Sequence, residues 1–148
     1  LVASRAIRAA LEAGDVAAAN AALGHPWFVA ARVEHGDKRG RDLGFPTANL
    51  HLADDCRLRH GIYAVRAALD GMTADGVASF GKRPTFDDGR PKLEVYLFDF
   101  AGDLYGKEIE ISFIGWIRGE ARFDSVEALV QRIKADCEAA KLLLEAAP

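Results

Sequence analysis

Apolar residues follow two spacings along this chain of 148 residues, helical near both ends and strand-like in between. Residues 4–23 are dominated by alanine and leucine, and Gly14-Asp15 supplies a helix stop followed by an N-cap. Near the other end, apolar side chains recur at helical spacing; they are Val126, Leu129, Val130, Ile133, Cys137, Ala140 and Leu144. We predict two short helices over 4–23 and one helix over about 125–146, with Asp124 as N-cap and Glu127 completing an approximate capping box.

Between the helical ends, short runs of β-forming residues are separated by glycine, proline and aspartate. The runs that we expect to form strands are 27–35, 61–70, 73–80, 92–100 and 107–117. Asp70-Gly71 predicts a tight hairpin. Because no helical pattern separates the runs, they favour an antiparallel barrel over the parallel βαβ units of a dinucleotide-binding sheet.

Two of these runs differ in how many of their faces are apolar. In 107–113 one face is polar, because Ile109, Ile111 and Phe113 alternate with Glu108, Glu110 and Ser112. In 92–100 both faces are apolar; one carries Leu93, Val95 and Leu97, and the other carries Tyr96, Phe98 and Phe100. Glu94 shares the aromatic face of this second strand.

The composition and charge of the chain argue against several classes of function. About half of the residues are apolar (50%), enough for one domain with a core, and the net charge of −3 argues against a partner bound through nucleic-acid phosphates. Cys56 and Cys137 lack metal-ligand spacing, so we expect two reduced thiols and a cytoplasmic protein. No run of 18 apolar residues exists, so we expect no membrane partner. The first residues show neither an initiator methionine nor a signal-peptide pattern, which suggests a piece of a longer protein.

A glycine-rich basic segment, 36–49, is the first candidate for chemistry. Gly36, Gly40 and a third glycine at 44 let backbone approach a ligand, and Lys38 and Arg41 can face phosphate oxygens. The segment is not a Walker A loop, because no Gly-Lys-Ser/Thr follows its glycines. A solvated connection is the alternative interpretation.

Thr47 and Asn49 project to the same side of an extended segment, so a hydroxyl and an amide oxygen can share a cation. Mg²⁺ takes one or two such oxygens from a protein and the rest from water and nucleotide phosphates. The alternative is that both residues stabilise a turn after Pro46.

Glu94 is the candidate base. Beside Tyr96 and Phe98 its carboxylate would be partly desolvated, which favours the neutral form and makes the ionised form a better base. A position at the rim, with the carboxylate in water, is equally compatible with the pattern.

Two further loops allow both functional and structural interpretations. The segment 81–89 carries two positive charges and a turn signal, and its default role is structural. The segment 116–123 mixes aromatics with arginine; it can grip a planar heterocycle or pack the last helix onto the barrel. The four histidines, at 25, 35, 51 and 60, have no metal-ligand spacing and are interpreted as surface or loop residues.

In this order the motifs resemble the riboflavin kinase family, specifically the C-terminal kinase module of bacterial bifunctional FAD synthetases. The resemblance rests on Gly-Phe-Pro-Thr-Ala-Asn at 44–49, Gly-Ile-Tyr-Ala-Val at 61–65, Arg-Pro-Thr-Phe at 83–86, Leu-Glu-Val at 93–95, Asp-Phe at 99–100, Asp-Leu-Tyr-Gly-Lys at 103–107, Ile-Arg at 117–118 and Phe-Asp-Ser at 123–125. It spans nearly everything from Trp27 onward.

The resemblance implies a mainly β fold, a six-stranded antiparallel Greek-key barrel with a C-terminal helix and short N-terminal helices. It implies that ATP phosphorylates riboflavin to FMN, that Mg²⁺ assists, and that Glu94 is the general base. The family's ATP-side positions correspond here to Gly36, Lys38, Gly40, Arg41, Thr47, Asn49, Leu97, Asp99 and Tyr105, with Thr47 and Asn49 also on the metal. Its flavin-side positions correspond to Arg118, Ala121, Arg122 and Phe123.

The start of the chain resembles the end of the adenylyltransferase module of the same enzymes, although Ala3-Ser4-Arg5 replaces the usual Ser-Ser-Thr. We therefore expect residues 1–24 to be a helical linker left from that module and 25–148 to be the kinase domain, with its barrel over about 27–118. Without the module, FAD formation is not expected. The rival interpretations are a flavin-binding barrel without turnover and a small nucleic-acid-binding barrel, which the acidic balance disfavours.

Overall fold

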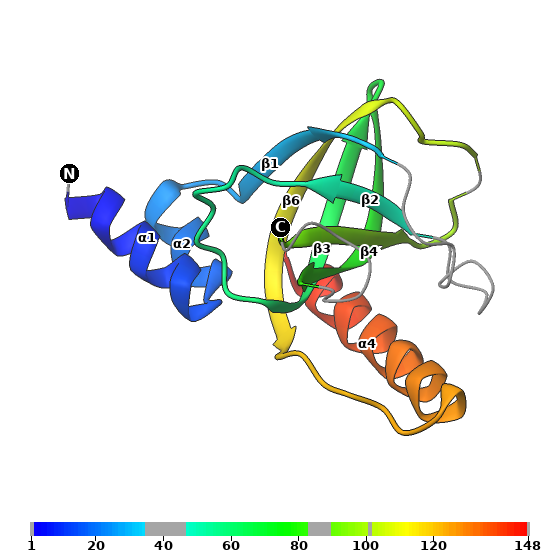
Figure 1. The fold of residues 1–148 in the computed structure, drawn as a ribbon. Helices are drawn as coiled ribbons and strands as arrows, with labels where there is room; N and C mark the ends of the chain where they lie inside the picture. The colour runs from blue at the N-terminus through cyan, green and yellow to red at the C-terminus, as the bar shows by residue number, and fades with distance from the viewer. Residues whose placement is uncertain (1, 35–46, 83–89, 101, 148) are drawn as a thin grey trace.

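The computed structural model describes residues 2–34, 47–82, 90–100 and 102–147 (Figure 1). Its helices are α1 (Val2–Ala13), α2 (Val16–Leu23) and α4 (Val126–Ala146). Its strands are β1 (Trp27–Arg32), β2 (Ala48–His51), β3 (Gly61–Leu69), β4 (Met72–Gly81), β5 (Lys92–Leu97) and β6 (Glu108–Arg118).

The six strands form one antiparallel sheet in the order β1-β6-β3-β4-β5-β2. The sheet curls until its two edge strands approach each other, because the backbone amide of Glu34, just beyond β1, donates to the carbonyl of Asn49 in β2 at 2.8 Å. This bridge joins the two edges of the sheet. Figure 1 shows the resulting curled half-barrel. The mainly β, six-stranded antiparallel class is confirmed.

The hairpin between β3 and β4 forms where the sequence predicts it. Leu69 pairs with Met72, and the two residues between them have positive φ angles, 50° for Asp70 and 77° for Gly71. Two consecutive residues of this kind make the tight turn whose twist matches that of antiparallel strands. The hairpin therefore fixes the register of the two strands in the middle of the sheet.

The interior of the curled sheet holds the main core. Its largest fully buried side chains include Tyr63, Phe80 and Phe113, and Tyr63 packs edge-on against Phe113 with ring centroids 5.3 Å apart. The Tyr63 hydroxyl donates to the carbonyl of Arg59 at 2.6 Å, and burial raises the pKa of Tyr63 well above its usual range. Apolar burial of this kind holds the strands around one centre.

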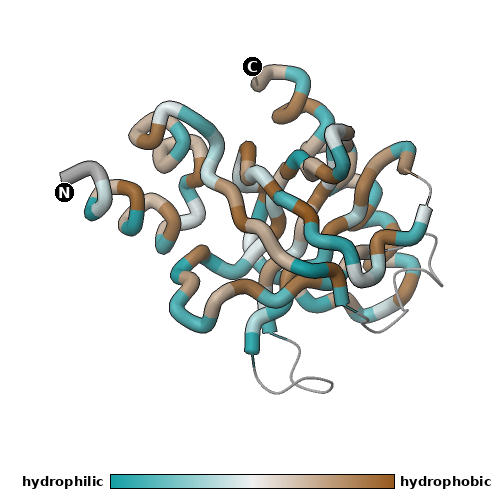
Figure 2. Tube along the Cα trace, turned by 90° about the horizontal axis from the view of Figure 1, so that it is seen from above, coloured by the Kyte–Doolittle hydropathy of each residue, from teal (hydrophilic) through white to brown (hydrophobic). Residues whose placement is uncertain are grey.

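The two N-terminal helices pack directly on this core, as buried Leu11, Val16 and Ala19 belong to the same apolar cluster. Figure 2 shows hydrophilic and hydrophobic positions alternating along these helices. Asn20 joins them to the sheet, because its side chain accepts from the amide of Trp27 at 2.7 Å and donates to a β6 carbonyl at 2.8 Å. The helices are thus continuous with the barrel, and the domain division at residue 24 stays a prediction.

Helix α4 covers the outer face of the sheet over β3, β4 and β6. The buried helix residues Cys137, Ala140 and Leu144 pack on Ile62 of β3 and on its neighbours. The predicted N-cap, Asp124, is wrong: the side chain of the next residue, Ser125, accepts from the amide of Ala128 at 3.0 Å. Because the cap is Ser125, the helix begins at Val126, one residue later than a cap at Asp124 would place its start. Val126 itself is exposed.

The predicted strand 92–100 ends earlier than expected. β5 stops at Leu97, and the turn that follows places Asp99 at a φ of 52°. As a result Phe100 packs against the interior core, whereas Phe98 packs with the cluster under α4. The expectation that Phe100 shares a face with Phe98 is therefore wrong, because the turn reverses the alternation.

Two further expectations from the sequence concern membrane-spanning segments and the state of the two cysteines. In the described part of the chain, no helix combines the length and apolar character needed to cross a membrane. Cys56 and Cys137 are both free thiols, as predicted, and burial raises the pKa of each.

Candidate functional site

A row of directly opposed residues crosses five strands on the outer face of the sheet. Asn49 of β2 lies opposite Glu94 of β5, which lies opposite Ser79 of β4. Ser79 in turn lies opposite Ile62 of β3, and Ile62 opposite Arg118 of β6. Side chains of opposed residues share a face, so the row places Asn49 about 5 Å and Arg118 about 15 Å from Glu94, one and three strand spacings away.

Asn49 and Glu94 are thus brought together from segments 45 positions apart in the sequence, as the numbers of the pair show. Asn49 is buried, with 6% of its surface exposed. Its amide nitrogen donates to the carbonyl of Thr47 at 3.5 Å, and its oxygen Oδ1 is buried without a hydrogen-bond partner among the described residues. A buried oxygen without a donor is an acceptor site that a cation or a hydroxyl can satisfy.

Thr47 stands half-buried one residue before β2. Its side chain and that of Asn49 lie two positions apart on an extended backbone, so they are on the same side of it. A hydroxyl and a buried amide oxygen are oxygen donors that fit Mg²⁺. The described residues contain no cluster of three carboxylate, histidine or cysteine groups that would serve a metal instead.

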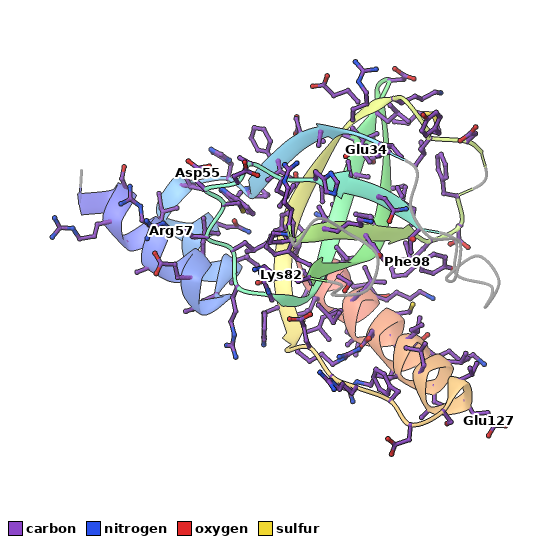
Figure 3. The ribbon with its side chains drawn as sticks, in the orientation of Figure 1. Glu34, Asp55, Arg57, Lys82, Phe98 and Glu127 are labelled. Carbon is purple, nitrogen blue, oxygen red and sulfur yellow. The ribbon has the colours of Figure 1, made fainter. Side chains whose placement is uncertain are left out.

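Sequence reasoning missed Glu34 and His51 at this end of the row. His51 was interpreted as a surface or loop residue, but it lies in β2 two positions beyond Asn49. Its Nδ1 is 2.8 Å from a carboxylate oxygen of Glu34, which Figure 3 labels beside β2, and its Nε2 is buried with no partner in the described residues. The two-residue spacing that relates Thr47 to Asn49 also places 51 on the same face, provided that the segment is extended.

Of the other predicted nucleotide-side residues, Leu97 ends β5 and packs in the interior, on the face opposite to Glu94. Leu97 lines a cavity of about 260 Å³ at the hairpin end of the barrel. Its apolar wall includes Ala67, Phe100, Leu104 and Ile109, and Asp103 and Lys107 also line it. Asp99 and Tyr105 are exposed in the two turns that carry these wall residues.

The last residues of β5 lie between this cavity and the row, because Leu97 lines the cavity and Glu94 belongs to the row. β2 pairs with β5 only from Lys92 to Val95, so Tyr96 and Leu97 extend beyond the described start of β2. Leu97 is three residues from Glu94, or about 10 Å along the strand. The cavity and Glu94 are therefore close enough for one elongated ligand to contact both.

The four predicted flavin-side residues lie at the other end of the row. Ala121 and Arg122 are exposed in the segment between β6 and α4, and Phe123 is half-buried there. Arg118 differs from them, because its guanidinium binds the carboxylate of Asp136 in α4 through two hydrogen bonds of 2.8 and 2.7 Å. Sequence reasoning had not identified Asp136, which interrupts the apolar stripe of the helix.

The same segment touches the end of β4. Oε1 of Glu120 lies 3.5 Å from Nδ1 of His60, and the other carboxylate oxygen, Oε2, would lie 2.3 Å from a Cβ placed on Gly81. The absence of a side chain at Gly81 therefore leaves room for Glu120. The segment is positioned by contacts to β4 on one side and to α4 on the other.

Some predicted residues lie outside the described part of the chain. These are the phosphate-loop residues Gly36, Lys38, Gly40 and Arg41 and most of the loop 81–89. Lys82, labelled in Figure 3, is the last described residue before that second gap and is exposed.

Comparison with known proteins shows the family to which the chain belongs. The family model for flavokinase, described as riboflavin kinase, matches residues 23–144. A bifunctional riboflavin kinase/FMN adenylyltransferase from Pseudomonas fluorescens is 46% identical over 143 residues, which cover 96% of this chain and 46% of the relative. The protein of the same name from Bacillus subtilis (strain 168) is 43% identical over 139 residues, covering 91% of this chain and 44% of its own. The chain thus spans less than half the length of these curated relatives.

Two solved structures share the fold. The crystal structure of riboflavin kinase from Trypanosoma brucei is 26% identical with a TM-score of 0.59, and the match covers 82% of this chain and 81% of that one. A crystal structure described as a macrolide-efflux protein from Streptococcus pneumoniae is 39% identical with a TM-score of 0.86, covering 93% of this chain and 46% of that one. Since the family model matches most of the chain and a structural relative carries the same name, the chain belongs to the riboflavin kinase family.

Proposed function

We propose that this chain transfers the γ-phosphoryl group of ATP to the 5′-hydroxyl of riboflavin, forming ADP and FMN, with Glu94 as general base. The observation that carries the proposal is the direct opposition of Glu94 and Asn49 on the outer face of the sheet. A carboxylate and a buried oxygen acceptor one strand spacing apart can serve the two partners of a phosphoryl transfer, the attacking hydroxyl and the metal-bound phosphate.

Glu94 is held on a strand that is paired on both sides, by β2 and by β4. This pairing fixes the direction of its side chain, which is half-buried. Its carboxylate accepts the proton of the 5′-hydroxyl as that oxygen bonds to the γ-phosphorus and the bond to the β-phosphate oxygen breaks. A base positioned in this way contributes about 10²–10⁴-fold to the rate.

The cavity at the hairpin end of the barrel is the proposed site of the nucleotide base. It is bounded largely by apolar side chains, among them Leu97 and Phe100, which suits a flat heterocycle. The phosphates would then extend past Thr47 toward Glu94, which lies about 10 Å along β5 from Leu97. The phosphate-loop residues, Lys38 and Arg41 included, are proposed to face the same phosphates on the evidence of their sequence pattern.

Thr47 and Asn49 are the proposed protein ligands of Mg²⁺. The hydrogen bond from the Asn49 amide nitrogen to the Thr47 carbonyl leaves Oδ1 of Asn49 as the oxygen available to a cation. Mg²⁺, when bound with ATP, neutralises charge that develops on the transferred phosphoryl group.

The flavin is proposed to extend from Glu94 toward the segment between β6 and α4 along the edge of α4, since Ile62 of the row is already buried under that helix. About 15 Å separate these two ends, three strand spacings, which a five-carbon ribityl chain and a three-ring heterocycle can span. Phe123 and the exposed Ala121 and Arg122 would then meet the ring system at the far end.

The relatives from Pseudomonas fluorescens and Bacillus subtilis are named as bifunctional. We propose that this chain is the kinase module of such a cytoplasmic enzyme and that FMN adenylyltransferase activity resides in a further module. The family model begins at residue 23, close to the end of α2.

The test of the proposed function is incubation of the chain with riboflavin and MgATP, followed by chromatographic separation of riboflavin, FMN and FAD. We expect FMN and no FAD. The rival interpretation, a flavin-binding barrel without turnover, predicts quenching of riboflavin fluorescence with no FMN, and that result would refute the kinase assignment.

The proposed metal ligands give a second prediction. Thr47→Ala combined with Asn49→Ala should weaken MgATP binding by about tenfold, since both oxygen ligands from the protein are lost, while riboflavin binding changes less than about twofold. Isothermal titration calorimetry with MgATP and fluorescence titration with riboflavin measure the two affinities. Ser112→Ala on the far strand β6 is the matched control for loss of a polar side chain. Unchanged MgATP affinity in the double variant would remove both residues from the site.

A further inference from the structure

Arg118 is the centre of a contact network that links the end of β6 with α4. Its Nε and Nη2 donate to the two carboxylate oxygens of Asp136 at 2.8 and 2.7 Å, the two-pronged geometry that only arginine offers a carboxylate. The two side chains are 13% and 6% exposed, so the pair lies largely out of water. Figure 1 shows the segment between β6 and α4 leaving the end of β6 for the far end of the helix, which then runs back toward the sheet.

The same guanidinium contacts two residues of that segment. Its Nη1 donates to the carbonyl of Gly119 at 3.0 Å, and its central carbon lies 5.7 Å from the centre of the Phe123 ring. Gly119 and Phe123 are the first and last residues of the stretch that faces the proposed flavin site. The side chain of Arg118, which the carboxylate of Asp136 holds in place, therefore positions both the first and the last residue of this stretch.

We propose that Asp136 is a positioning residue for riboflavin: it fixes the guanidinium of Arg118, which in turn fixes the segment Gly119–Phe123 against the flavin. This inference rests on the proposed function. It also changes the role expected for Arg118 from the family resemblance, because three of its N–H groups are already bound to Asp136 and Gly119. Arg118 acts on the flavin through the segment.

A structural role alone makes a different prediction. Replacement of a buried ion pair by apolar residues of similar size is often neutral or stabilising, because the desolvation of two charges is avoided. If the pair served only stability, apolar replacement would leave riboflavin binding unchanged. If it positions the segment, the variant folds but binds riboflavin more weakly, because methionine makes neither the hydrogen bond to Gly119 nor the guanidinium contact with Phe123.

The experiment compares the wild-type chain with Asp136→Asn, Arg118→Lys and the double replacement Arg118→Met with Asp136→Leu. Glu138→Gln, a carboxylate two residues further along α4 whose side chain is 76% exposed, is the control. Riboflavin affinity is measured by fluorescence quenching without ATP, kcat and both KM values by FMN formation, and folding by thermal melting.

We expect all three variants to raise the riboflavin Kd and KM about tenfold, with the KM for ATP and kcat within about threefold of wild type. Arg118→Lys keeps the charge and still fails, because lysine lacks the two-pronged geometry. The double variant should melt within a few degrees of wild type. The proposal is overturned if the folded double variant binds riboflavin as wild type does. Failure of the wild-type chain itself to bind riboflavin would instead refute the proposed function, and the inference with it.

Discussion

Glu94→Gln is expected to lower the turnover number for FMN formation by about 10²–10⁴-fold while the affinities for riboflavin and MgATP stay within about threefold of wild type. Glutamine has nearly the same shape as glutamate and fits the same place between β2 and β4, but it cannot accept the hydroxyl proton. Some activity should remain, because positioning and charge neutralisation contribute much of the catalysis of phosphoryl transfer and do not need the base.

The measurement separates chemistry from binding. Single-turnover formation of FMN gives the rate of the chemical step, and fluorescence and calorimetric titrations give the two affinities. Glu110→Gln is the matched control, since Glu110 is an exposed glutamate on β6, opposite Ala30 and Ala68, and not in the row. Its turnover should stay within about twofold of wild type. Normal binding by Glu94→Gln together with wild-type turnover would show that Glu94 is not the base.

Local patterns predicted most of the fold, because five of the strands carry clear alternation or dense β-forming residues. The strand that residue-level reasoning did not identify is β2, which has only four residues, Ala48–His51. Such a short segment carries too little alternation to separate it from a turn after Pro46. Its pairing with β5 and its bridge to Glu34 are long-range contacts, and they make it a strand.

The candidate site was predicted as separate residues and not as an arrangement. Chain-local spacing places Thr47 beside Asn49, but the register that sets Asn49 opposite Glu94 depends on how β2 docks on the sheet. Such a register cannot be obtained from either segment alone. The same limit explains the missed partner of Arg118, because Asp136 reaches it only after α4 packs on the outer face.

The second large effect is expected at Gly61, where β3 begins. A Cβ at this position would lie 2.4 Å from a ring carbon of Trp116 and 2.6 Å from the carbonyl oxygen of Arg118. The carbonyl belongs to the backbone of β6, so it cannot move aside without disturbing the pairing of β3 with β6. Gly61→Ala should therefore lower the free energy of unfolding by about 3 kcal/mol, at the upper end of overpacking costs. The melting temperature should fall by roughly 10 °C.

Gly119→Ala is the matched control, because a Cβ there meets no atom within 4 Å. It should change the free energy of unfolding by less than about 0.5 kcal/mol. A double-mutant cycle with Trp116→Leu separates the two contacts: removing the large ring should relieve part of the cost of Gly61→Ala, giving a coupling of about 1 kcal/mol or more. The remainder comes from the Arg118 carbonyl, which the ring replacement leaves in place. Urea unfolding of the four chains of the cycle and of Gly119→Ala measures each difference. A Gly61→Ala chain as stable as Gly119→Ala would show that β3 and β6 do not approach each other as closely as described, and with that the position of Arg118 at the end of the row would be lost.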